Sequence, residues 1–193
     1  MAGVRRSLGL FGGAFDPPHL GHVALARAAG EHFGLERLLI LVVADPGHKR
    51  TTAPVEARLE LARLAFGDVP GADVEIDRHA RTVDFLEERR PQDAVFLIGG
   101  DELADFASWK SPERVLELVE LGVALRPGVP ELELREARAR LPAPGRISFF
   151  PLQPVPVSSS GIRERIARGE RIDGLVPPKV AAAIERLALY REG

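Results

Sequence analysis

The chain has 193 residues, a formal net charge of −2 and no cysteine, and 45% of its residues are hydrophobic and 28% charged. This length predicts a single domain spanning residues 1–193. The charge balance argues against a nucleic-acid partner, which requires a basic face, and the absence of cysteine excludes disulfides, thiolate catalysis and cysteine-bound zinc. No apolar run reaches the roughly 18 residues that cross a bilayer, and no signal-peptide core follows Met1, so we expect a cytoplasmic protein without a membrane partner.

Strand-like and helix-like segments alternate along the chain. Continuous apolar runs, such as 38–43, are typical of strands that are covered on both faces. We expect strands at 8–11, 37–44, 73–76, 94–98, 121–125 and 146–150. We expect helices at 21–33, 54–66, 83–90, 112–119, 131–140, 161–168 and 178–190. The alternation predicts an α/β fold, a Rossmann-like open parallel sheet with helices on both faces and a small C-terminal helical portion.

Two details refine the expected helices. Gly34 follows the first helix, and glycine commonly ends a helix because it adopts the left-handed conformation freely. In the second helix, helical spacing predicts a buried face made of Val55, Leu59, Ala62 and Phe66. Ligands of parallel sheets bind at the carboxyl ends of the strands, so the loops that begin there are where a site is expected.

The most informative loop follows the first strand and reads Gly12-Gly13-Ala14-Phe15-Asp16-Pro17-Pro18-His19-Leu20-Gly21-His22. Glycines let backbone N–H groups approach an anion, and the start of the next helix adds free donors and partial positive charge. Two imidazoles at that helix start can donate hydrogen bonds to a phosphate that undergoes substitution. We expect Gly21 to leave room for substrate and Asp16 to order the loop. The pattern indicates nucleotidyl transfer.

Other interpretations of the histidine pair are weaker. A zinc half-site lacks a cysteine, a glutamate between the histidines and an evident third ligand. A purely structural pair leaves the preceding glycines unexplained. The chain has neither G-x-x-x-x-G-K-[ST] nor G-x-G-x-x-G, which argues against a P-loop NTPase and an ordinary dinucleotide-dependent dehydrogenase.

A second polar segment lies far downstream, at 157–166, with the sequence Val-Ser-Ser-Ser-Gly-Ile-Arg-Glu-Arg-Ile. Taken alone it is a polar loop with a helix cap, and we expect Ser160 to be the N-cap. Arg163 then offers a forked donor for phosphate.

These segments together resemble the bacterial nicotinate mononucleotide adenylyltransferase family of the H-x-G-H nucleotidylyltransferase superfamily. Residues 12–22 resemble its GGxFDPxHxGH signature, and 157–166 resemble its I-S-S-T-x-I-R signature. The resemblance extends in order over nearly the whole chain, through Ile98-Gly99-Gly100-Asp101, Trp109, Arg126-Pro127-Gly128 and the tail from Gly174 to Tyr190.

The resemblance implies transfer of AMP from ATP to nicotinate mononucleotide, giving deamido-NAD and pyrophosphate without a covalent intermediate. It implies Mg²⁺ bound with ATP, and we expect water and phosphate oxygens rather than a carboxylate cage as its ligands. The implied catalytic residues are His19, His22 and Arg163. The implied ATP-binding residues are Gly12, Gly13, Ala14, Phe15, His19, His22, Gly99, Asp101, Arg126, Ser158, Ser159 and Arg163. The implied mononucleotide-binding residues are Gly13, His48, Lys49, Thr82, Gly100, Asp101 and Trp109, with Trp109 stacked on the pyridine ring.

The chain departs from the family pattern at several positions. Ala80-Arg81 replaces the usual Ser-Tyr, Phe85 replaces a threonine, and Ala14 stands where threonine or serine is commoner. The usual P-P-H-K segment is altered to Asp45-Pro46-Gly47-His48-Lys49. These departures concern substrate preference more than reaction type.

Alternative functions stay open from the sequence. They are adenylylation of nicotinamide mononucleotide, adenylylation of phosphopantetheine, and nucleotide sensing without catalysis. His19 and Trp109 favour the pyridine nucleotide over phosphopantetheine, and retention of both histidines and Arg163 argues against a sensor. Asp101 is also a candidate N-cap, Trp109 a candidate core residue, and the chain a candidate homo-oligomer.

Overall fold

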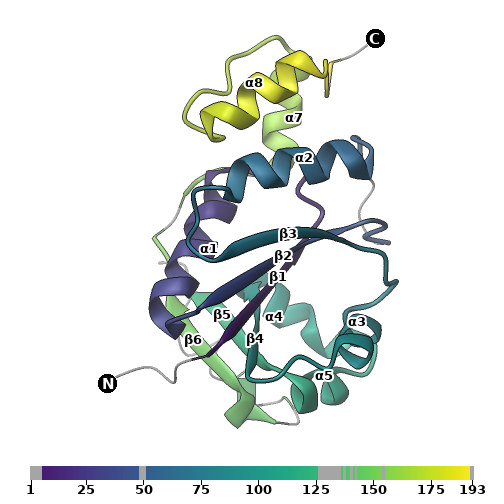
Figure 1. The fold of residues 1–193 in the computed structure, drawn as a ribbon, viewed down its shortest axis with the longest axis vertical. Helices are drawn as coiled ribbons and strands as arrows, with labels where there is room; N and C mark the ends of the chain where they lie inside the picture. Colours follow the sequence, from purple (N-terminus) through teal and green to yellow (C-terminus); the bar gives the residue numbers. More distant parts are fainter. Residues whose placement is uncertain are drawn as a thin grey trace.

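The computed structural model describes residues 6–47, 51–125, 136, 138–139, 141, 143–153 and 155–191. Within these residues six strands form one parallel sheet in the order β3-β2-β1-β4-β5-β6 (Figure 1). The strands are β1 (Leu8–Gly13), β2 (Arg37–Val43), β3 (Ala72–Asp77), β4 (Ala94–Gly99), β5 (Glu120–Leu125) and β6 (Ile147–Pro151). The predicted open parallel sheet is therefore confirmed.

Helices cover both faces of this sheet, as the alternating pattern predicts. One face carries α1 (Leu20–Phe33) and α2 (Val55–Phe66), with α7 (Ser159–Ala167) and α8 (Pro178–Arg186) stacked beyond α2 (Figure 1). The other face carries α3 (Thr82–Arg89), α4 (Gly100–Asp105) and α5 (Pro112–Leu118). Two short 3₁₀ turns, η1 (Phe106–Ser108) and η2 (Pro144–Arg146), complete the elements that the structure describes.

Each face of the sheet has its own hydrophobic core. Phe11, Phe33 and Phe66 belong to the core under α1 and α2, whereas Leu41 and Phe96 belong to the core under α3, α4 and α5. Because both faces are covered, β4 is buried along its whole length. This explains why the strands appear in the sequence as continuous apolar runs.

Some helix details differ from the sequence-based expectations. The buried face of α2 consists of Arg58, Leu61, Ala62, Ala65 and Phe66, so the predicted Val55 and Leu59 are only half-buried. The last helix ends at Arg186 instead of residue 190, and α4 and η1 were not predicted. Gly34 does end α1 in the left-handed conformation, with φ 60°. Most of the expected helix 131–140 lies outside the described residues.

The strand order places the carboxyl ends of β1 and β4 side by side. The chain runs outward from β1 in one direction and returns to its other side at β4, which is the arrangement that opens a crevice for ligands. The first motif begins at Gly13, where β1 ends, and α4 begins where β4 ends. The fold therefore brings the predicted glycine loops to the same crevice.

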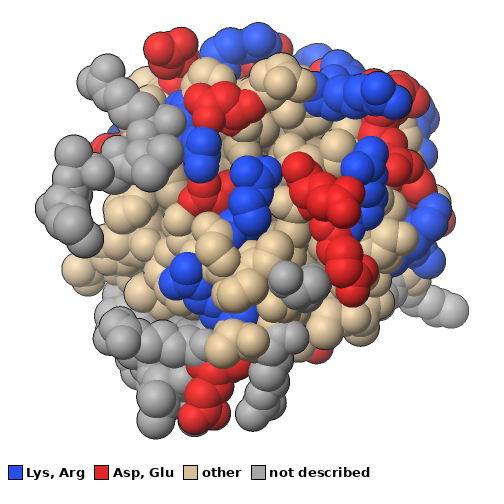
Figure 2. Space-filling view, turned by 90° about the horizontal axis from the view of Figure 1, so that it is seen from below, with Lys and Arg blue, Asp and Glu red and all other residues tan. Residues whose placement is uncertain are grey.

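On the face seen from below, Lys and Arg lie interspersed with Asp and Glu and form no continuous basic band (Figure 2). In the described part of the chain, no helix has the length and apolar character needed to cross a membrane.

Candidate active site

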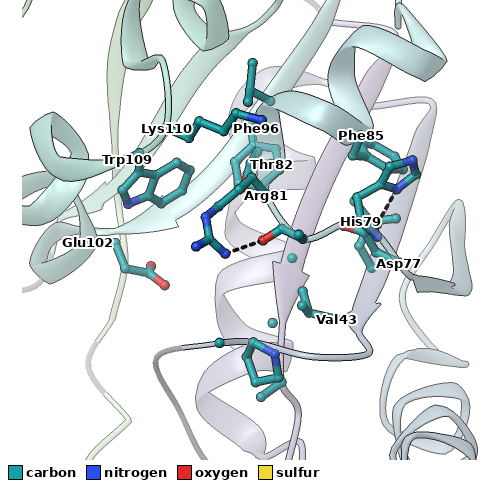
Figure 3. Close-up of a pocket in the computed structure, with 18 of the residues that line it drawn as sticks. Val43, Asp77, His79, Arg81, Thr82, Phe85, Phe96, Glu102, Trp109 and Lys110 are labelled. Atoms are coloured by element: carbon teal, nitrogen blue, oxygen red, sulfur yellow. Dashed lines mark hydrogen bonds and ion pairs between the residues drawn. The ribbon is translucent and has the colours of Figure 1, made fainter.

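A cavity of about 840 Å³ lies at the carboxyl ends of β1, β2, β3 and β4 (Figure 3). Its walls come from these strand ends, from the start of α3 and from the turn between α4 and α5. The predicted site residues that line it are Gly12, Gly13, Ala14, Thr82 and Trp109. The other described candidates belong to the loop after β1, to the start of α7 and to the start of α4.

The two histidines of the first motif form a stacked pair at the start of α1. Their ring centroids are 3.6 Å apart with an interplanar angle of 20°. His19 precedes the helix, and its backbone N–H donates to Nδ1 of His22 at 3.2 Å. A backbone N–H can donate only to an unprotonated ring nitrogen, so neutral His22 carries its proton on Nε2. This hydrogen bond therefore orients the His22 ring at the start of α1.

Aromatic and small residues keep this pair in place. The Phe15 ring is buried and packs edge-on against His22, with centroids 5.1 Å apart. Any nucleotide contact of Phe15 is therefore left to its backbone. A Cβ on Gly21 would lie 3.1 Å from two ring atoms of His19 and 3.4 Å from Cγ1 of Val157. A side chain at this position would therefore crowd His19, and the use of this space by substrate stays a prediction.

Asp16 is the hydrogen-bonding centre of the first-motif loop. Its carboxylate is buried and accepts from Thr52 N at 2.6 Å, Ala53 N at 3.1 Å and the Tyr190 hydroxyl at 2.8 Å. Burial, together with the charge of Asp16, raises the pKa of Tyr190 above its ordinary value. Tyr190 consequently stays a hydrogen-bond donor at all physiological pH values. Asp16 orders the loop, as expected, and also ties it to the end of the chain.

Arg58 of α2 satisfies the backbone carbonyls around the same loop. Its side chain is 1% exposed and lies near Asp16. Burial lowers the pKa of Arg58, and the charge of Asp16 offsets part of this effect. Arginine stays protonated under such a shift. Its guanidinium donates to the carbonyl oxygens of Ala14, Val43 and Ala44 at 2.8 Å and of Ala53 at 3.1 Å. The ends of β1 and β2 are therefore held by one side chain.

The second motif docks directly on this loop, although the two lie far apart in the sequence. Ser159 Oγ donates to Pro17 O at 2.8 Å, and Arg163 Nη1 donates to Asp16 O at 2.7 Å. Arg163 has five N–H donors, so this bond leaves others for a ligand. Ser158, not the predicted Ser160, is the N-cap of α7, because its Oγ accepts from Gly161 N at 3.1 Å.

The start of α4 lies at the end of β4. Gly99 precedes the helix, and its N–H donates to Oε2 of Glu102 at 2.6 Å. Glu102 thus performs the capping role that the sequence analysis considered for Asp101. Gly100 and Asp101 occupy the first turn, where Asp101 is exposed.

The cavity wall opposite the strand ends is formed by Trp109 and the start of α3. Trp109 is half-buried, and its ring lies 5.2 Å from Phe106 and 6.2 Å from Phe96 between centroids. It therefore packs against the core and faces the cavity at once. Thr82 is the first residue of α3, and Arg81 before it makes no side-chain cap. The N–H groups of Thr82 and Val83 in this first turn have no partner within an α-helix.

His79 connects the end of β3 with α3 at the edge of the cavity. Its Nδ1 lies 2.7 Å from Asp77 Oδ1, and its Nε2 lies 3.1 Å from Glu88 Oε2. The hydrogen bond to Glu88 and then that to Asp77 raise the pKa of His79 above 6.5. This bridge fixes the loop that carries Arg81 and Thr82.

Three predicted binding residues, His48, Lys49 and Arg126, lie outside the described residues. In the part that is described, no three His, Asp or Glu side chains gather closely enough to hold a metal ion.

The sequence analysis missed the residues that support the site. For Arg58 the sequence does contain a signal. It is a charged residue at helical spacing from Leu61 and Ala62, and so lies on the apolar face of its helix. Tyr190 is the chain's single tyrosine, but nothing local indicates that it reaches Asp16. His79 shows no pattern of its own, and Arg81 is marked in the sequence only as a departure from the family pattern.

Comparison with known proteins gives consistent results. Residues 10–165 match the family model described as cytidylyltransferase-like. A relative from Thermus thermophilus, named "Probable nicotinate-nucleotide adenylyltransferase", is 42% identical over 193 residues, covering 95% of this chain and 99% of the relative. A relative with the same name from Thermomicrobium roseum is 39% identical over 196 residues, covering 95% and 91% of the two chains.

Solved structures agree on the fold. The Plasmodium falciparum nicotinic acid mononucleotide adenylyltransferase complexed with NaAD superposes with a TM-score of 0.74 at 16% identity, over 96% of this chain and 98% of that one. The crystal structure of a putative nicotinate-nucleotide adenylyltransferase from Vibrio parahaemolyticus gives 0.66 at 19% identity, over 97% of both chains.

Replacing Arg58 with methionine should destabilise the protein strongly. Arg58→Met removes the donor to four carbonyls, of buried Ala53 and half-buried Ala14, Val43 and Ala44, together with a buried cation near Asp16, so we expect the free energy of unfolding to fall by about 3–5 kcal/mol. Arg63→Met, on the exposed side of the same helix, should change it by less than about 0.5 kcal/mol. Urea denaturation measures both, and equal losses in the two variants would contradict the role of Arg58.

The His79 bridge should stabilise the protein at low pH only. Because the folded-state pKa of His79 is raised, its contribution is complete below about pH 6.5 and is lost as the pH rises through the folded-state value. Relative to the wild type, His79→Gln should lose about 0.5–1 kcal/mol of unfolding free energy near pH 5.5 and less near pH 9. Denaturation at both pH values measures this. Glu88→Gln should weaken the same pH dependence, and a His79→Gln deficit that is equal at both pH values would refute the bridge.

Proposed function

The chain belongs to the cytidylyltransferase-like family and, within it, to the nicotinate-nucleotide adenylyltransferases, and from this premise we propose how its site works. The protein transfers AMP from ATP to nicotinate mononucleotide and releases pyrophosphate, a step of NAD biosynthesis. The observation that supports this most directly is the junction of the two motifs: Ser159 and Arg163 bind the loop that positions His19 and His22. The groups suited to a triphosphate thus lie around one loop beside the cavity.

The cavity suits the mononucleotide. Trp109 offers a ring face for the pyridine, and Thr82 offers the free N–H groups of a helix start. Gly13 lines the same cavity where β1 ends and where the loop to the histidines begins. We assign His48 and Lys49 to the mononucleotide phosphate, and Gly100 and Asp101 to the ribose between the two substrates.

ATP is assigned to the loop after β1 and to the starts of α1, α4 and α7. In this arrangement Gly12, Gly13, Ala14 and Phe15 contribute backbone groups, and we also assign Gly99 and Arg126 to ATP. Ser158 and Ser159 build the start of α7, and Arg163 directs its remaining guanidinium donors to the outer phosphates. His19 and His22 face the α-phosphate, where negative charge develops.

The reaction needs alignment more than it needs a reactive side chain. A phosphate oxygen of the mononucleotide forms a bond to the α-phosphorus of ATP, and the bond from that phosphorus to the bridging oxygen breaks. The bond electrons leave with pyrophosphate, and no proton has to move. Nε2–H of His22 and the guanidinium of Arg163 stabilise the added charge in the transition state.

Mg²⁺ fits this site as a companion of ATP. Phosphate oxygens of the bound nucleotide and water would be its ligands, because Mg²⁺ at phosphate sites usually keeps several waters. When bound, the ion neutralises part of the triphosphate charge.

Purified protein with Mg-ATP should release pyrophosphate when nicotinate mononucleotide is added. Phosphopantetheine should give no release, because it has no aromatic ring to stack on Trp109. A coupled pyrophosphate assay measures both reactions. Release with phosphopantetheine alone would reassign the acceptor, and the absence of release with either acceptor would support a nucleotide sensor.

Removing the imidazole of His22 should slow the chemical step. We expect His22→Ala to lower kcat by about 10²- to 10³-fold, the scale for losing one preorganised donor. His22→Gln places an amide donor near the position of Nε2, whereas His22→Asn keeps only an acceptor near Nδ1 for the His19 N–H. Steady-state kinetics should therefore rank Gln above Asn in kcat, with His32→Ala at the exposed end of the same helix as the unaffected control. The reverse ranking would mean that His22 acts through the helix cap alone.

A further inference from the structure

The charged side chains that line the cavity do not balance one another. Carboxylates come from Asp45, Asp77, Glu102 and Asp105, and cationic groups come from His79, Arg81 and Lys110. His79 pairs with Asp77, and Lys110 Nζ pairs with Asp84 Oδ1 at 2.7 Å. Among the residues that the structure describes, Arg81 is the lining cation for which no carboxylate partner is found. Arg81 is therefore the side chain of this cavity that can form an ion pair with a negatively charged ligand.

The Arg81 guanidinium is directed into the cavity and partly fixed there. Its Nη1 donates to the carbonyl oxygen of Ala80 at 2.7 Å, and a Cβ on Gly47 across the cavity would lie 3.6 Å from the same nitrogen. Figure 3 shows the side chain pointing from the start of α3 to the side where Trp109 and Glu102 project. Because one N–H is used, the other donors of the fork are preset for a ligand.

We propose that Arg81 binds the carboxylate on the pyridine ring and makes the enzyme prefer the acid form of the mononucleotide to the amide form. The inference rests on the proposed function, in which the ring lies against Trp109 within the same cavity. A carboxylate accepts two parallel N–H bonds from a guanidinium, whereas a neutral amide does not. Without Arg81, the unpaired carboxylates of the cavity repel the acid but not the amide. The preference therefore depends on a side chain that departs from the family pattern.

The two mononucleotides provide an internal control, because they share the ribose, the phosphate and the ring. Arg81→Gln should lower the ratio of kcat/KM for the acid to kcat/KM for the amide by about 10- to 100-fold, the range for losing a charge-assisted hydrogen bond. Arg81→Lys keeps the charge but not the fork, so its ratio should be intermediate. Arg78→Gln removes the same charge from an exposed residue outside the cavity lining and should leave the ratio unchanged.

Binding measured without turnover separates this inference from the proposed function. Trp109 is the only tryptophan of the chain, so its fluorescence reports occupation of the cavity by either mononucleotide. Arg81→Gln should raise the Kd of the acid about 10-fold or more and leave that of the amide nearly unchanged. Equal weakening of both ligands, as a phosphate contact or a structural role would give, overturns the inference, and so does an unchanged acid affinity. If the wild type turns over neither mononucleotide, the proposed function fails, and the titrations still decide the role of Arg81.

Discussion

The candidate site depends on one buried carboxylate at the end of the first strand. Asp16 is nearly inaccessible to water, and a charge in that position is tolerated only when it is fully hydrogen-bonded and near a cation. The Thr52 and Ala53 amides, the Tyr190 hydroxyl and the nearby Arg58 guanidinium meet that requirement. Because these groups come from different parts of the chain, satisfying Asp16 fixes the loop against both the end of β2 and the C-terminal helices.

A rigid loop is what a direct transfer between two bound substrates requires. In the proposed mechanism, rate enhancement comes from alignment and from donors aimed at developing charge. The hydrogen bond from His19 N to His22 Nδ1 contributes to both, since it orients the ring and selects the tautomer with Nε2–H. Arg163 is likewise oriented by its bond to Asp16 O. The same contacts that stabilise the fold therefore preorganise the groups that we propose to bind phosphate.

The sequence predicted the sheet well because its strands are apolar runs between helical segments, a pattern that local composition carries. It also predicted which motifs belong together, through the family resemblance. It could not show which of three consecutive serines caps α7, since Ser158, Ser159 and Ser160 have identical chemistry and only the backbone path decides. It missed α4 because six residues that continue directly from a strand leave no helical period to detect. Arg58 and Tyr190 act through contacts over long sequence separations, which no local pattern encodes.

The chain's departures from the family pattern lie mainly on the acceptor side of the cavity, and the chemistry accounts for this. The triphosphate has the same shape whichever acceptor is used, so the loop after β1 and the start of α7 must present nearly fixed donors. In our proposal the ring substituent is bound at the start of α3, where one exchange alters recognition without moving the phosphates. Phe85 illustrates the freedom of this wall: it is buried, packs edge-on against His79 at 5.6 Å, and lies under the Arg89 guanidinium at 5.6 Å. There the ring supports the loop that carries Arg81, so a position that departs from the family's threonine now stabilises the residue that faces the substrate.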